Sequence, residues 1–505
     1  MRPLTRSCCS HFRSGSLPLS RGAIRQLLRP SSPKTLYSPL PFWLVRRNHD
    51  AADASAASAH VHSQKADAIV VGGGAAGIAV VGNLLEVIPD GKIVWIDRAF
   101  EGGAIGQLYR ELPSYSPAGD YLQYALNLRT FRDICDAAPQ PNVFTALKDL
   151  DLDMTCPLYY AADLLTLISD GLIQHPRIEP ILGNVTRAVR NPSTRNWRIT
   201  LTPNHDLGEP PLSIHYTAPL VVYCTGSRPR ATDLPIHLSR LTLETCLSPS
   251  RLARLLPTSE PRTVAVVGSG HAAVLALRNL FRLAAVSHRQ LRIRWFTRTA
   301  SLTYAAFRDD DGALLHEHDG LMGEAARFAK TMLEGERLAT SGAGAYITRF
   351  VLPQVDEKEA AGMSEKAREI MEGDAMRPHL EGVDYVVQCI GFERARLPEV
   401  RPGLGPLAGP VGTARRLVFN GLTGSLFPSS GSRNEVLGLF GAGSAFPELE
   451  LAVEGWRQPA VGVWKFMRFV HKMVPRWVTA TKVGRFTRAE DRDLEEGRRR
   501  YHEYY

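Results

Sequence analysis

Cysteine is scarce in this sequence of 505 residues, which holds seven and no Cys-x-x-Cys pair. Cys8 and Cys9 are adjacent, and the others are Cys135, Cys156, Cys224, Cys246 and Cys389. This spacing excludes a disulfide-dense scaffold, a cysteine-based metal site and a redox-active dithiol motif. Cys224 and Cys389 lie within apolar runs, so we expect both to be small buried hydrophobic residues.

Two other features are missing as well. No stretch of roughly 20 residues lacks both charges and turn-forming residues, so the sequence predicts no membrane-spanning helix. His316 and His318 stand two residues apart on a predicted loop and lack further ligands at a useful spacing. We therefore expect no metal site.

Acidic residues are absent from residues 1–49, which contain nine of the 60 Lys and Arg residues. The 51 basic residues that remain balance the 51 acidic residues of the chain. A body without net charge offers no clustered surplus of cations to a phosphate backbone, so we expect no nucleic acid partner. The length exceeds what one hydrophobic core organises, so the protein is predicted to be multidomain.

The leading segment is also rich in serine, and its stretch Arg21–Arg29 places Ile24, Leu27 and Leu28 on one face of a helix. This pattern is typical of a mitochondrial presequence. We expect residues 1–49 to direct the protein to the matrix or to a matrix-facing membrane surface, with cleavage near Arg46. A disordered basic tail is the alternative. Residues 50–64 read as a linker.

A dinucleotide-binding pattern begins at residue 68. An apolar strand leads into Gly72-x-Gly74-x-x-Gly77, a helix to about Glu86 follows, and the run 92–97 ends in Asp97. The glycines allow a tight turn and a close approach to a diphosphate, the helix N-terminus attracts it, and the acid accepts hydrogen bonds from a ribose.

The same pattern recurs at Gly268-x-Gly270-x-x-Ala273, with a helix to about Leu283 and a strand at 291–296. Here Thr297-Arg298-Thr299 replaces the acid. An arginine at this place can pair with a 2′-phosphate, which favours NADPH over NADH. The alternative is that Arg298 belongs to a solvated loop. His271 is expected to cap the helix or to face the diphosphate.

Three further strands end at glycines. Their ends are Thr225-Gly226, Ile390-Gly391 and Gly441-x-Gly443, and the third strand is predicted to lead into a helix near Pro447. Glycine at a strand end lets the backbone pass close to a bound cofactor.

This ordered set of motifs resembles the flavoproteins with two dinucleotide-binding domains, over roughly residues 65–475. The superfamily includes disulfide reductases, flavin monooxygenases and quinone-reducing dehydrogenases. The resemblance implies an α/β fold in which a Rossmann-like NAD(P)-binding domain is inserted into a discontinuous Rossmann-like FAD-binding domain. FAD would occupy the first site and NADPH the second. The expected domain bounds are 65–255 and 385–475 for FAD and 256–384 for NADPH, followed by a charged tail at 476–505.

The resemblance also extends to individual residues. The segment Phe100–Tyr109 looks like the glycine-rich stretch that lies along FAD in such proteins, which implies roles for Gly102, Gly103 and Gln107. One departure is Ser444, which stands where the family usually carries an aspartate.

The branches of the superfamily differ in what they require. Disulfide reduction needs a cysteine pair beside the flavin, and the sequence has none. A monooxygenase needs NADPH, flavin, O₂ and a pocket with little water, so this branch is our first interpretation, with a small organic substrate. We keep this interpretation although the F-x-G-x-x-x-H motif of several monooxygenase families is absent. The sequence assigns no catalytic side chain.

Two alternatives stay open. A predicted helix over 460–474 carries Lys465, Arg468 and Lys472 along one side, and such a stripe can rest on an anionic membrane, as in a quinone oxidoreductase. The same helix can instead be the last helix of the FAD domain with a solvated basic edge. The other alternative is a flavin-binding protein without turnover.

Overall fold

The computed structural model divides the chain into two compact units, Met1–Ala59 and His60–Tyr505. It describes residues 64–203, 214–258, 260–308, 314–316, 320–353, 362–402, 417–428, 435–451 and 457–483, all in the second unit. The predicted presequence, nearly all of the predicted linker and most of the predicted tail lie outside the described residues. Among the described helices, none combines the length and the apolar character that crossing a bilayer requires.

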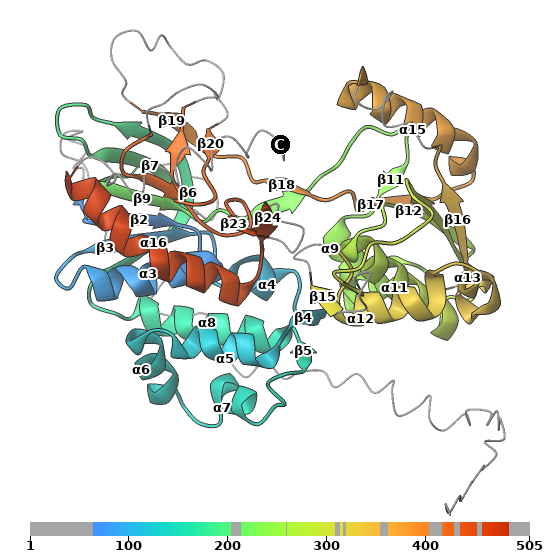
Figure 1. Ribbon diagram of the computed structural model, residues 1–505, viewed down its shortest axis with the longest axis horizontal. Coiled ribbons are helices and arrows are strands. Elements are labelled where there is room, and N and C mark those ends of the chain that lie inside the picture. The colour runs from blue at the N-terminus through green and yellow to red at the C-terminus, as the bar shows by residue number, and fades with distance from the viewer. Residues whose placement is uncertain are drawn as a thin grey trace, which may run out of the picture. The chain divides into compact units, whose positions relative to one another are not determined.

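The first domain is built on parallel strands in the order β6-β3-β2-β9-β22 (Figure 1). Their bounds are β2 Ala68–Val71, β3 Ile93–Asp97, β6 Ile178–Arg190, β9 Leu220–Tyr223 and β22 Leu439–Gly441. β2 and β9 are buried along their whole length, as expected for central strands covered on both faces. The sheet continues from β6 through the antiparallel β7 (Trp197–Pro203) and β8 (Ile214–Ala218), with β1 (Gln64–Lys65) and β19 (Glu399–Arg401) at its margins.

Helices cover one face of this sheet, with α3 and α16 closest to it (Figure 1). Their bounds are α3 Ala75–Val87, α16 Val463–Val483, α5 Ala118–Leu126, α6 Arg129–Ala137, α7 Val143–Lys148 and α8 Tyr159–Ile173. Asn83 of α3 donates to the sulfur of Met467 at 3.5 Å and lies 2.9 Å from His471 Nδ1. The shorter elements are α4 Gly103–Gln107, β4 Pro113–Pro117, β5 Thr155–Pro157, β20 Val418–Phe419 and β21 Leu426–Phe427.

The C-terminal part of this domain differs from the prediction in two respects. No helix begins near Pro447, because residues 448–451 form strand β23 (Glu448–Leu451), paired with β24 (Arg457–Ala460). The last helix runs through Pro475 to Val483 and buries Trp477, whose indole donates to the carbonyl of Thr423 at 2.7 Å. Residues 476–483 therefore belong to the domain and not to a tail.

The basic edge of α16 meets carboxylates of its own domain. Arg468 pairs with Glu450 at 2.5 Å, and Lys472 lies 3.8 Å from Glu448. Met467 and Val474 on the apolar side are fully buried. The helix is thus packed as the last helix of the domain, and Arg468 and Lys472 pair with carboxylates of the protein.

The second domain is a parallel sheet in the order β11-β17-β12-β13-β16. Its strands are β11 Ser239–Arg240, β12 Arg262–Val267, β13 Leu291–Thr297, β16 Ile347–Val351 and β17 Tyr385–Gln388. α11 (His271–Val286) packs on the face that includes Trp295, and α15 (Glu365–Leu380) packs on the opposite face against Phe296 (Figure 1). The predicted two-domain α/β architecture, with one Rossmann-like sheet inserted into the other, is confirmed.

The inserted domain has wider bounds than predicted. α9 (Leu243–Leu247) and α10 (Pro249–Leu255) pack into its core, and β17 lies inside its sheet, so residues 239–255 and 385–388 belong here. The chain passes between the sheets through β10 (Ser227–Pro229) and β18 (Phe392–Arg394), which pair antiparallel. The other short helices of the inserted domain are α12 Gly323–Phe328, the π-helix Ala329–Leu333, α13 Arg337–Thr340 and the 3₁₀-helix Gly342–Ala345.

The polar segment after residue 305 is not simply a loop. Its ends form the antiparallel pair β14 (Ala306–Arg308) and β15 (Leu314–His316). His318 lies outside the described residues. Within the described ranges, no group of three or more His, Cys, Asp or Glu residues is arranged to hold a metal ion.

Candidate functional site

The turn after β2 can accept only glycine at two of its positions. Gly72 has φ +119°, and a Cβ there would lie 2.2 Å from the carbonyl oxygen of Cys224. A Cβ on Gly77 would lie 1.9 Å from the oxygen of Gly72, because helix α3 packs directly on the turn. Gly74 begins α3 with no side-chain cap, so the first backbone N–H groups of the helix are left for a ligand.

The turn after β12 repeats this geometry. Gly268 has φ +124°, and a Cβ there would lie 2.3 Å from the oxygen of Cys389. Gly270 precedes α11, again without a side-chain cap, and a Cβ built on it meets nothing within 4 Å. Ala273 is fully buried where the helix packs on the sheet. Open space in front of an uncapped helix suits a diphosphate.

A pair of tryptophans, which the sequence reasoning missed, supports both turns. Trp95 on β3 donates its indole N–H to the oxygen of Gly72 at 3.0 Å, and Trp295 on β13 donates to the oxygen of Gly268 at 2.7 Å. Each hydrogen bond holds the first peptide of a glycine turn. The sequence signal was available, because both second strands carry a tryptophan two residues before their last residue.

Other predicted glycines gather around the first turn. A Cβ on Gly103 would lie 2.6 Å from the Cα of Gly74, and one on Gly443 would lie 2.8 Å from the Cβ of Ala76. Gly226 has φ +72° and faces Ser444, whose hydroxyl accepts from Ser227 at 3.1 Å. Strand ends far apart in the sequence thus meet at the start of α3.

The remaining predicted residues are placed differently. Gly102 has φ +71° and is buried against Leu165, where it begins α4. Gln107 is exposed at the end of α4, and its backbone oxygen accepts from Arg251 at 3.0 Å. Gly441 packs against the ring of Phe446, and Gly391 is an exposed residue with φ +100° in the passage between the sheets. None of these four residues lies against Gly72, Gly74 or Gly77 in the way that Gly103 does.

Asp97 stands at the end of β3, next to the turn. Its Oδ2 accepts from the N–H of Gly73 at 2.6 Å, and its Oδ1 accepts from those of Ala99 and Phe100 at 2.9 and 2.8 Å. A carboxylate offers about four lone-pair sites, so one acceptor position is left for a hydroxyl group. The backbone therefore fixes the orientation of the carboxylate.

The second domain has no such acid. Thr297 occupies the position that corresponds to Asp97, counted from the tryptophan, and it is 1% exposed. Arg298 follows and pairs with Glu372 of α15, with Nε at 2.7 Å and Nη2 at 3.0 Å from the carboxylate oxygens. The absence of an acid is as predicted. The arginine lies in the bend after β13, and its exposed side chain is held by this carboxylate, so the structure also fits the alternative of a solvated loop residue.

His271 is the first residue of α11 and does not cap it, since Gly270 holds the cap position. Its ring lies edge-on to that of Tyr115, with 5.7 Å between the centroids. Burial lowers the pKa of His271 to about 4, so the imidazole is neutral at physiological pH. A neutral ring at a helix N-terminus avoids placing a cation at the positive end of the dipole.

This shift predicts a pH dependence of stability. The unfolded chain binds a proton at His271 near pH 6.5, whereas the folded protein does so only near pH 4. The neutral His271 therefore makes its full contribution to the stability of the folded protein above pH 6.5, and this contribution is lost as the pH falls towards 4. The free energy of unfolding can be measured by urea titration at pH 7.5 and at pH 4.5. Between these pH values it should fall by on the order of 2 kcal/mol less in His271→Gln than in the wild type. An equal loss in both proteins would contradict this prediction.

The residues present fit nucleotide cofactors. The hydroxyl of Thr225 is buried without a hydrogen-bond partner in the described structure, at the edge where Gly226 and Ser444 meet. A buried polar atom of this kind needs a partner, and a bound cofactor can supply one. The uncapped N-termini of α3 and α11 offer N–H groups to a diphosphate, and the space beside Gly270 gives it room.

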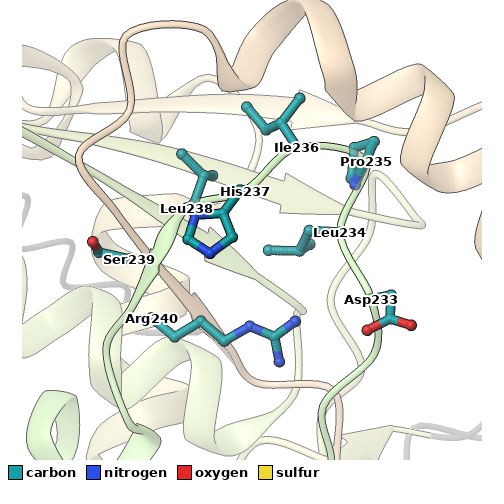
Figure 2. Close-up of a pocket in the computed structure, with 8 residues that line it drawn as sticks. All are labelled: Asp233, Leu234, Pro235, Ile236, His237, Leu238, Ser239 and Arg240. Atoms are coloured by element: carbon teal, nitrogen blue, oxygen red, sulfur yellow. The ribbon is translucent and has the colours of Figure 1, made fainter.

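A hollow on another part of the molecule contains none of these residues. It is lined by Asp233, Leu234, Pro235, Ile236, His237, Leu238, Ser239 and Arg240, with their side chains shown in Figure 2. This segment leads from β10 into β11, and Pro235 packs on α15 at Gly373. The two glycine turns lie elsewhere, so we assign the hollow no role.

No family model matches the sequence. A curated protein does: monooxygenase AgnR1 of Paecilomyces divaricatus is 38% identical over 420 residues, which are 83% of this chain and 99% of that protein. The chain belongs to the family of this monooxygenase. This membership confirms the monooxygenase branch of the prediction over the quinone reductase and the non-catalytic flavoprotein.

Two solved structures are also similar to this chain. A flavin monooxygenase mutant from Stenotrophomonas maltophilia is 16% identical, with a TM-score of 0.46 and coverage of 82% of this chain and 99% of that one. S-allyl-L-cysteine S-oxygenase from Allium sativum is 11% identical, with a TM-score of 0.48 and coverage of 87% and 82%. The described cysteines are all free and buried, which confirms the predicted burial of Cys224 and Cys389.

Proposed function

We propose that this protein is an FAD-dependent monooxygenase that takes its reducing equivalents from NADPH and oxygenates a small organic molecule. One observation carries the proposal: two parallel sheets each end in a glycine turn and an uncapped helix, held by a tryptophan. Membership in a monooxygenase family supports the use of O₂.

The first turn is the proposed FAD site. Gly72, Gly74 and Gly77 shape the turn, and the first N–H groups of α3 face the diphosphate. Asp97 accepts from the adenosine ribose through its remaining lone pair. Gly103 and Gly443 bring two further backbone segments against the same turn, and Thr225 offers its unpaired hydroxyl.

FAD, when bound, supplies the hydride acceptor and the reactivity towards O₂. The protein contributes binding, orientation and the exclusion of water. Tyr115 and His271 approach each other from β4 and α11, so aromatic rings contributed by both domains are in contact. A neutral His271 brings no positive charge into this region at physiological pH.

The second turn is the proposed NADPH site. Gly268 and Gly270 open the approach to α11, and Ala273 allows the helix to pack closely on the sheet. Thr297 replaces an acid that would repel a 2′-phosphate. This exchange favours the phosphorylated coenzyme.

Anaerobic mixing of the purified holoprotein with NADPH tests the proposal. We expect a yellow protein whose flavin absorbance bleaches with NADPH, and more slowly with NADH, and returns when air is admitted. A colourless preparation that takes up no added flavin would rule out the first site. A yellow protein that neither nucleotide reduces would rule out the second.

The location of the enzyme is proposed separately. We propose import into mitochondria, on the basis of the basic, serine-rich and acid-free residues 1–49. A fusion of residues 1–49 to a fluorescent protein should accumulate in mitochondria. A diffuse cellular signal would refute this part of the proposal.

A further inference from the structure

Two arginines lie near the end of β13, and they differ in what faces them. Arg298 is bound through two nitrogens to Glu372. Arg349, on the neighbouring strand β16, forms no ion pair within the described part of the chain. Its Nε donates to the hydroxyl of Thr297 at 3.2 Å, and its Nη2 donates to the oxygen of Thr299 at 2.8 Å. Arg298 shares the carboxylate of Glu372 with Arg368, whereas Arg349 feels the charge of Glu334 without forming an ion pair with it.

The two arginines also lie on different faces of the sheet. Arg349 pairs with Trp295 in the parallel register, and its guanidinium lies 4.2 Å from the indole ring. The same indole donates to Gly268 in the turn before α11. Side chains alternate along a strand, so Arg298 follows Phe296 towards α15, away from that turn. Arg349 is therefore the arginine on the nucleotide side.

The hydrogen bonding of Arg349 leaves it able to bind an anion. A guanidinium has five N–H donors, and two of them hold the Thr297–Thr299 turn, which corresponds to the ribose-binding end of the first domain. Its Nη1 has no acceptor within the described residues. The stacking on Trp295 fixes the plane of the fork, as bidentate phosphate binding requires.

We propose that Arg349 is the residue that binds the 2′-phosphate of NADPH, and that Glu372 withdraws Arg298 from this role. The inference rests on the proposed function, because it names the specificity determinant of the second site. It departs from the sequence-based assignment of the phosphate to Arg298.

Binding of two small ligands that differ only in the 2′-phosphate tests the inference without turnover. Adenosine 2′,5′-bisphosphate and 5′-AMP are titrated calorimetrically into the flavin-loaded wild type and into Arg349→Gln and Arg298→Gln. We expect Arg349→Gln to weaken the affinity for the bisphosphate about 10- to 100-fold and to leave the affinity for 5′-AMP within about twofold of the wild-type value. Arg298→Gln, the matched control, should change the affinity for the bisphosphate by less than about threefold. Arg349→Lys should recover only part of the loss, because an ammonium lacks the fork.

The outcomes separate the two proposals. If Arg298→Gln takes the large loss and Arg349→Gln does not, the inference is overturned. An equal loss of both ligands in Arg349→Gln also overturns it, since Arg349 would then only position the turn. A wild type that binds both ligands equally well refutes the preference for NADPH, while the flavin content shows whether the first site stands. Near-UV circular dichroism and flavin content check that each variant is folded.

Discussion

Gly74→Ala should yield a folded protein that has lost its flavin. A Cβ at this position lies 3.7 Å from the Cα of Gly103, an ordinary contact, and φ is −84°, which alanine adopts freely. Because alanine is a slightly poorer N-cap than glycine, the free energy of unfolding should fall by no more than about 1 kcal/mol. The methyl group nevertheless projects at the N-terminus of α3, where the diphosphate needs close contact with the backbone.

The measurement is the affinity of the apoprotein for FAD, followed by flavin fluorescence. We expect a loss on the order of 100-fold. Gly72→Ala is the contrasting variant, because its Cβ would lie 2.2 Å from a carbonyl oxygen and its φ of +119° is strained for alanine. That variant should lose both stability and flavin. A Gly74→Ala protein that binds FAD normally would remove the first site from the proposal.

Gly270→Ala should separate the two nucleotide sites. Its Cβ meets nothing within 4 Å and φ is −74°, so the fold accepts the methyl group without strain. The flavin content should stay at the wild-type level. Affinity for NADPH and for NADH should fall together by on the order of 100-fold, because the methyl group obstructs the diphosphate that both coenzymes share.

Equilibrium titration of the oxidised coenzymes NADP⁺ and NAD⁺ provides the readout. A parallel loss of both in Gly270→Ala contrasts with the selective loss expected for Arg349→Gln. Retention of wild-type affinity for both coenzymes in Gly270→Ala would mean that the space in front of α11 is not where they bind. Gly74→Ala serves as the matched control, since it should lose FAD without changing the second turn.

The likeness of the two domains extends beyond their glycines. Cys224 and Cys389 each follow directly after a parallel strand, and the carbonyl oxygen of each lies against the first glycine of a turn. Trp95 and Trp295 hold the opposite side of these turns. Each turn is therefore fixed from two neighbouring strands. Such fixing keeps the N–H groups of the helix aligned before a ligand arrives.

The sequence alone determined the positions of both turns and the strands that lead into them. Continuous apolar runs, tight glycine spacing and the acid at Asp97 are local signals, set by backbone sterics and by the burial of parallel strands. The same reasoning failed where a distant contact decides the outcome. α16 continues through Pro475 because Trp477 is buried against Thr423, and residues after Pro447 form a strand because β24 pairs with them.

The tertiary structure alone decided which cation lies on the side of the second glycine turn. The position of Arg298 after β13 is a sequence property, but its pairing with Glu372 depends on how α15 packs. Arg349 lies 51 residues further along the chain, and only the parallel register of β13 and β16 stacks it on Trp295. Charge pairing depends on distance in space, and separation in the sequence does not reveal that distance.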